Sequence, residues 1–317
     1  MKSFSCLIFI LWTCTSFALE DAKADEKFYR PSRNLGLASS DLTLPLISFL
    51  FPGTGQIITG QYEYGVVYST IAISGLVVST SEAARIRHIT DDKDTVTTKN
   101  NSLRKYQLGL QTYQTMGGFS LFQSFRTSVK IRQESGGQYV FIKNEETPLD
   151  IASAPFKLSF LQKTSTWIPI SLGVALNLWI LHHPDKGWGR TALTANDAGF
   201  AAAFSWNAGT HEEAVFRGWM MPVFRENWMN DHWSNLAQAS TFAAAHLSTN
   251  DFPIIQFFLG LHLGCVTQSN GWSIGESVFI HTWWDIIAFL GAYQLKKDNP
   301  DHAPPAKLML PPLTLSF

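Results

Sequence analysis

Long apolar runs separated by polar stretches mark the whole chain, and they lie closest together in its second half. Each run there is about 14–22 residues long, which suits a tilted or partly submerged membrane helix. The runs cover residues 165–181, 194–209, 234–247, 252–268 and 273–295. This pattern predicts an all-α fold, a polytopic membrane helical bundle with polar loops.

The first half has fewer apolar runs and longer polar segments. Residues 42–51 form one run, Pro52 and Gly53 interrupt it, and a second run follows at 64–80. Because proline and glycine at this density break a helix, we expect a short helix, a bend and a spanning helix. Residues 81–107 are polar and rich in lysine and arginine, which predicts a cytoplasmic loop.

Two features lie between the halves. Residues 108–129 are amphiphilic, contain the pair Gly117-Gly118, and are a weaker membrane candidate. Residues 126–150 are again polar. The glycine-containing stretch at 135–137 is the best candidate for a boundary between two regions of the chain.

The two ends of the chain differ from the rest in composition. Residues 1–18 combine Lys2, an apolar run too short to span a membrane, and small residues up to Ala18. This arrangement predicts a secretory signal peptide that is cleaved after Ala18. An uncleaved first anchor and a lipoprotein leader that ends at Cys14 are the weaker alternatives. The tail, residues 296–317, is rich in proline and is expected to be extended or disordered.

Composition fits a membrane protein with long polar loops. Charged residues make up 15% of the chain, against roughly 25% in soluble domains, and the mean hydropathy is +0.01. A net charge of −1 gives no reason to invoke nucleic acid. Cys6 and Cys14 lie in the leader, which leaves Cys265, so we expect no internal disulfide and no cysteine-based zinc site in the mature chain.

Two adjacent carboxylates and an arginine stand in the middle of the apolar half. On a helix, Glu213 and Arg217 are four residues apart and can form an ion pair. Glu212 lies about 100° further round the helix and is left to face something else. Because a charge at bilayer depth costs about 2.5–3.5 kcal/mol on insertion scales, such residues are usually there for function.

Two further predicted helices carry polar side chains at helical spacing. Phe242 and His246 share one helix face, and so do His281 and Asp285. Taken singly, each group has an ordinary structural explanation, such as a solvated ion pair or a hydrogen-bonded histidine. Unpaired polar groups are costly in an apolar bundle, so their joint occurrence favours convergence on one cavity.

Two other hydrolase signatures are excluded. His211-Glu212 begins like the metalloprotease helix His-Glu-x-x-His, but Val215 occupies the position of the second histidine. The chain has no Gly-x-Ser-x-Gly elbow, which argues against a serine hydrolase.

Three motifs in this order and spacing resemble those of the CPBP family, intramembrane proteases that include the type II CAAX prenyl endopeptidases and bacterial immunity-type relatives. They are Glu-Glu-x-x-x-Arg (Glu212, Glu213, Arg217), Phe-x-x-x-His (Phe242, His246) and His-x-x-x-Asn/Asp (His281, Asp285). With this resemblance, we divide the chain into a signal peptide (1–18), an N-terminal region with one to three membrane helices (19–150), a CPBP-like domain (160–295) and the tail (296–317).

The resemblance implies peptide-bond hydrolysis inside a membrane cavity. Glu212 would be the general base that activates water, and His246 would hold the same water. His281 and Asp285 would form the oxyanion side, with Glu213, Arg217 and Phe242 in supporting roles. The family often has asparagine where this chain has Asp285, and an ionised aspartate cannot donate a hydrogen bond to an oxyanion. It could instead orient His281 as imidazolium, or be protonated in a dry cavity.

The mechanisms proposed for the family divide between metal-activated and glutamate-activated water, and the residue set permits either. Glu212, His246 and His281 could bind zinc and leave an open coordination position. Equally, a partly desolvated carboxylate near histidine suits general-base catalysis. We favour the metal-free mechanism, with no cofactor, and keep zinc as the alternative.

Retention of all the chemically required positions favours an enzyme over a non-catalytic membrane scaffold or immunity-type relative of the same fold. The missing broken-helix repeat argues against a transporter. The expected partners are the lipid bilayer and a membrane-associated peptide or protein substrate. A secretory leader favours a bacterial protein of the inner (cytoplasmic) membrane. Nothing in the sequence identifies a prenyl pocket.

Overall fold

The computed structural model describes residues 35–88, 95–183, 188–247 and 253–297. The predicted signal peptide lies outside these residues, as does nearly all of the predicted tail.

The described chain is built from helices, as the apolar runs predict. One small exception joins the two ends of the C-terminal half, where β1 (Trp188–Arg190) pairs with β2 (Leu295–Lys297) as an antiparallel ribbon. The all-α prediction is therefore correct for the described residues apart from this ribbon.

The N-terminal half begins with the predicted short helix, bend and long helix. These are α3 (Thr43–Leu50), α4 (Thr54–Ile58) and α5 (Tyr62–Arg87), and α2 (Leu35–Ala38) precedes them. Gly53 makes the bend with a φ of +95°. A Cβ at this position would stand 2.2 Å from the carbonyl oxygen of Gly65. Glycine is therefore required here on both conformational and steric grounds.

The polar segment 81–107 is mostly helical, which corrects the predicted loop. α5 continues to Arg87, and α6 begins at Thr95 and runs to Gly136. An ion pair between Glu82 and Lys105 joins the two helices at 3.7 Å. Close helix packing and cross-helix ion pairs stabilise turns that hydropathy alone does not reveal. The end of α6 coincides with the boundary predicted at 135–137.

Each apolar run of the second half corresponds to a helix. The first run is α8 (Thr164–His182), and the connection before it contains α7 (Pro148–Ser153) and the short turns η1 (Ala154–Phe156) and η2 (Leu158–Gln162). The motif helix is α9 (Ala195–Val215), which continues through a π-helical turn, η3 (Phe216–Met220), into α10 (Met221–Asn227). The last three helices are α11 (Asp231–Ala245), α12 (Ile254–Ser269) and α13 (Gly275–Gln294).

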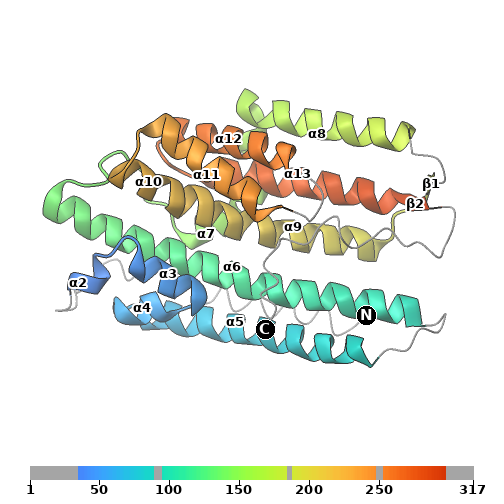
Figure 1. Cartoon of the computed structure of the whole chain (residues 1–317), viewed down its shortest axis with the longest axis horizontal. Coiled ribbons are helices and arrows are strands. Elements are labelled where there is room, and N and C mark those ends of the chain that lie inside the picture. The colour runs from blue at the N-terminus through green and yellow to red at the C-terminus, as the bar shows by residue number, and fades with distance from the viewer. Residues whose placement is uncertain (1–34, 89–94, 184–187, 248–252, 298–317) are drawn as a thin grey trace.

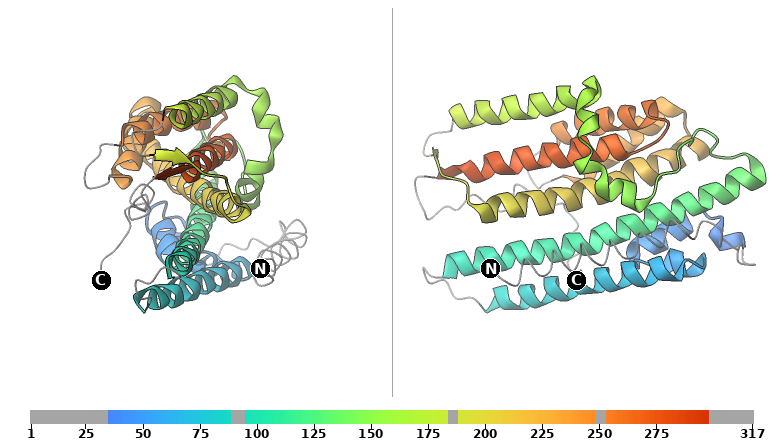
Figure 2. Two further views of the ribbon diagram at one scale, coloured as in Figure 1. Left: turned by 90° about the vertical axis from the view of Figure 1, so that its right-hand side faces the viewer. Right: turned by 180° about the vertical axis from the view of Figure 1, so that it is seen from behind.

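The long helices lie side by side with nearly parallel axes (Figure 1). α6 lies between α5 and α9, and α13 packs against α8, α9 and α12 (Figure 2). α9 is therefore enclosed by α6 on one side and α13 on the other. This central position is what brings its carboxylates into contact with the rest of the molecule.

Two of the described helices, α5 and α8, are long and apolar enough to cross a membrane. In the apolar window of each helix only 22% of the residues are buried, so most apolar side chains face outwards. On α8 these include Trp167, Leu172 and Trp179. A contiguous exposed apolar surface of this kind suits lipid surroundings. That further helices also span the bilayer stays a prediction.

Candidate active site

The motif helix α9 starts at a capping box. Thr194 Oγ1 accepts a hydrogen bond from the backbone N–H of Asp197, and Asp197 accepts one from the backbone N–H of Thr194. Burial alone would raise the pKa of Asp197, but hydrogen bonds from Thr194 and the neighbouring guanidinium of Arg104 hold it below its usual value. Thr194 is therefore the N-cap of α9.

α9 and α13 approach each other most closely one turn before the carboxylates. A Cβ at Gly209 would stand 2.3 Å from Thr282 Oγ1 and 3.0 Å from the backbone nitrogen of Thr282. The missing side chain lets the two backbones come together at this point. His281 is the neighbour of Thr282, so this contact carries it to the carboxylates of α9.

Glu213 is fully buried and binds two partners at once. Its Oε1 accepts a hydrogen bond from Arg217 Nη1 at 2.8 Å and another from His281 Nδ1 at 2.7 Å. Arg217 is also fully buried. The ion pair predicted from the four-residue spacing is therefore present, and His281 is a second partner that the sequence did not predict.

Glu212 occupies the position between the two histidines. It is 7% exposed, and its Oε2 has no hydrogen-bond donor. This oxygen lies 3.6 Å from His246 Nε2 and 3.8 Å from His281 Nε2. Asp285 closes the group, with Oδ2 at 3.6 Å from His281 Nε2. The structure thus brings together the four residues that the motifs nominate for chemistry.

The hydrogen bonds on the far side of each ring fix which nitrogen faces Glu212. His246 Nδ1 lies 2.8 Å from the carbonyl oxygen of Phe242, and a carbonyl can only accept. His281 Nδ1 likewise meets the carboxylate of Glu213. In a neutral ring with Nδ1 protonated, Nε2 is an acceptor. His246 Nε2 is then an acceptor that faces Glu212 Oε2, which suits a small molecule that donates hydrogen bonds to both atoms, such as water.

Phe242 packs at the base of the cluster. Its ring is 1% exposed and lies 4.6 Å from the His246 ring and 5.7 Å from the His281 ring, centroid to centroid. The guanidinium of Arg217 lies over the same ring at 4.4 Å. Phe242 therefore packs against the Arg217 guanidinium and both histidine rings and limits the orientations that these rings can take.

The cluster opens in one direction. The side chains of His246 and Asp285 are 22% and 24% exposed, whereas that of His281 is 4% exposed and that of Glu213 is fully buried. A ligand would meet His246 and Asp285 first and Glu212 behind them.

Glu212, His246 and His281 are residue types that zinc accepts, and an acceptor lies behind each Nδ1 atom, as in many zinc sites. Among the described residues, however, no group of three or more histidine, cysteine, aspartate or glutamate side chains is placed so as to hold a metal ion. The arrangement of the three residues in this structure therefore does not fit zinc.

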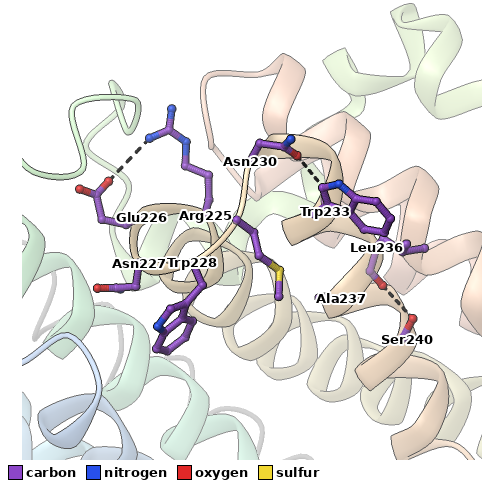
Figure 3. A pocket seen from close by; sticks show the side chains of 10 residues that line it. Arg225, Glu226, Asn227, Trp228, Asn230, Trp233, Leu236, Ala237 and Ser240 are labelled. Carbon is purple, nitrogen blue, oxygen red and sulfur yellow. Dashed lines mark hydrogen bonds and ion pairs between the residues drawn. The ribbon is translucent and has the colours of Figure 1, made fainter.

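A surface cavity of about 710 Å³ lies along α10 and α11, outside the cluster (Figure 3). The exposed side chains of Trp228 and Trp233 line it. Several of its polar groups already have partners: Arg225 pairs with Glu226 at 3.7 Å and with Asp231, outside the lining, at 3.0 Å, and Asn230 caps α11 through the backbone N–H of Trp233. Tryptophans in such positions are typical of a membrane–water interface. The cavity contains none of the residues of the cluster.

Residues 194–287 match the family model described as "Type II CAAX prenyl endopeptidase Rce1-like". This match, which covers less than a third of the chain, supports a protease of the CPBP family. The match begins at the cap of α9 and takes in Glu212, Glu213, Arg217, Phe242, His246, His281 and Asp285. No curated protein and no solved structure matches the chain.

The CPBP resemblance read from the three motifs is thus confirmed, although the match begins later than the domain predicted at 160–295. The match implies a protease that associates with membranes and acts on a peptide or protein. Together with the apolar helices α5 and α8, it indicates a membrane protein. α6, which covers the back of α9, lies outside the match.

Proposed function

We propose that this CPBP protein is an intramembrane endopeptidase that hydrolyses a peptide bond by glutamate-activated water. One observation carries the proposal. Glu212 Oε2 is buried without a donor and faces the Nε2 atoms of His246 and His281 at 3.6 and 3.8 Å. A water bound there would donate one hydrogen bond to Glu212 and one to His246, which fixes its position and directs a lone pair towards the open side of the cluster.

Hydrolysis then follows with the proton accounted for at each step. Glu212 takes a proton from the water, and the resulting hydroxide attacks the scissile carbonyl carbon. Collapse of the tetrahedral intermediate breaks the C–N bond, and Glu212 returns the proton to the leaving amine. The products are a carboxylic acid and an amine, and Glu212 ends as it began.

In this proposal His281 stabilises the oxyanion. Its Nδ1 is bound to Glu213, so an Nε2–H is present only in the imidazolium form. Asp285, at 3.6 Å from Nε2, supplies a counter-charge on the open side. In this role Asp285 orients His281 and does not donate to the oxyanion, which accounts for an aspartate where the family often has asparagine.

The substrate is expected to be a membrane-associated peptide or protein. Comparing the membrane proteomes of cells that express the wild type or Glu212→Gln would identify the substrate. Its cleavage fragments should be present with the wild type and absent with the variant. Glu63→Gln, which changes an exposed carboxylate at the start of α5, is the matched control and should leave the fragments unchanged.

The alternative function is a non-catalytic membrane scaffold of the same fold. If fragment patterns and cell phenotype were the same in wild-type, Glu212→Gln and His246→Ala cells, the protease proposal would be wrong. A scaffold role would then explain the packing of the cluster.

A further inference from the structure

The back of the catalytic helix is built by α6, a helix outside the family match. Thr115, Gly118 and Phe122 recur along one face of α6 at helical spacing. Each meets α9 or its extension. Thr115 Oγ1 donates a hydrogen bond to Asn207 Oδ1 at 2.7 Å, and Phe122 packs on Gly218, where a Cβ would stand 2.7 Å from the ring.

Gly118 makes the closest of these contacts to the chemistry. A Cβ on Gly118 would lie 2.8 Å from His211 Cβ, 2.9 Å from His211 Cα and 3.2 Å from the His211 carbonyl oxygen. Two of these atoms belong to the backbone of α9, so no side-chain rotation could relieve the clash. His211 directly precedes Glu212. The position of the Glu212 backbone is thus set by how closely α6 approaches at Gly118.

We propose that Gly118 is a positioning residue for Glu212, so that the N-terminal helices form part of the catalytic apparatus. This rests on the proposed function. Carbon atoms in contact prefer a separation of about 3.5–4.0 Å, so a methyl group at Gly118 pushes α9 away by roughly 0.5–1 Å. A catalytic group must be held to within about 0.5 Å, and a misplacement of about 1 Å can cost about 100-fold in rate.

The chain offers a matched control at the adjacent position. A Cβ on Gly117 would stand 2.7 Å from the carbonyl oxygen of Phe49 in α3, so Gly117→Ala is equally crowded but presses on a different helix. Both substitutions change the helix propensity of α6 in the same way. We expect Gly118→Ala to lower kcat by about 10–100-fold with KM unchanged, and Gly117→Ala to leave kcat within a few-fold of the wild type.

A second variant tests the same face without added bulk. Thr115→Val removes the hydrogen bond to Asn207, and we expect a several-fold lower kcat. Its control is Thr112→Val, because Thr112 Oγ1 donates to Leu108 O within α6 itself. Thr112→Val should behave as the wild type.

A spectroscopic readout separates this inference from the protease proposal. The ¹⁵N NMR signals of the His246 and His281 ring nitrogens report on the position of Glu212 whether or not a substrate is cleaved. Their chemical shifts should change in Gly118→Ala and remain those of the wild type in Gly117→Ala. If no variant or wild-type protein cleaved a substrate but these signals moved, the protease proposal would fail and the positioning role would stand. Equal kcat values and unchanged histidine signals in the two glycine variants would overturn the positioning role.

Discussion

Glu212 and Glu213 are adjacent on one helix, yet Glu213 is held by two partners while Glu212 Oε2 has none. Replacing each by glutamine separates the roles proposed for them. Glu213→Gln keeps the shape of the side chain but removes its charge. Arg217, which is fully buried, then loses the only carboxylate within hydrogen-bond reach among the described residues. His281 Nδ1 loses a charged acceptor at the same time.

The expected loss is large. Removing one partner of a buried ion pair costs about 3–5 kcal/mol, because an uncompensated charge is left behind. At about 2–4 °C per kcal/mol, which holds for chains of about 150–250 residues, Tm should fall by on the order of 10 °C. Glu212→Gln removes a charge that has no hydrogen-bond donor at Oε2. Its stability should stay within about 1 kcal/mol of the wild type, while proteolysis is lost.

The assay is thermal unfolding of the detergent-solubilised protein, followed by circular dichroism, alongside cleavage of a substrate found in the proteome comparison. Glu63→Gln serves as the control for a carboxylate that takes part in neither role. The reasoning is wrong if Glu212→Gln lowers Tm as much as Glu213→Gln does. It is also wrong if Glu213→Gln is as stable as the wild type.

Two further outcomes follow from the cluster. Asp285→Asn should keep activity within about tenfold of the wild type, because the neutral amide still fits beside His281 and can itself donate a hydrogen bond to the oxyanion. Asp285→Ala should lose more activity. Equal cleavage rates of the two variants would contradict the role proposed for Asp285. Prolonged treatment with a zinc chelator should leave the cleavage rate unchanged, and loss of activity that added zinc restores would instead favour zinc held by Glu212, His246 and His281.

The sequence predicts what is local along a helix. The Glu213–Arg217 pair follows from a spacing of four residues, and the cap at Thr194 follows from the residue types around it. The contact between Glu213 and His281 joins residues 68 positions apart. It depends on how α9 and α13 cross at Gly209, and no spacing along one helix contains that information.

The wrong prediction of a loop at 81–107 has a related cause. Hydropathy reports whether a segment prefers an apolar medium, and residues 81–107 are polar, so hydropathy gives no sign of their helices. Its helices form because α5 and α6 support each other. A Cβ on Gly109 would stand 2.6 Å from the carbonyl oxygen of Gly75, so the backbones touch there, and Glu82 pairs with Lys105 beyond that point. Tertiary packing of this kind decides the helical state of polar segments more than propensity does.

The residues around the bend at Pro52 hold α6 in place, and α6 in turn supports α9. Gln56 is fully buried and exchanges hydrogen bonds with Ser120 and Ser124 of α6. Gly55 lets it approach, since a Cβ there would stand 2.0 Å from Ser124 Oγ. Fully satisfied buried polar networks fix one packing arrangement. This one anchors α6 at Ser120, close to Gly118, so the bend and Glu212 are linked through a single helix.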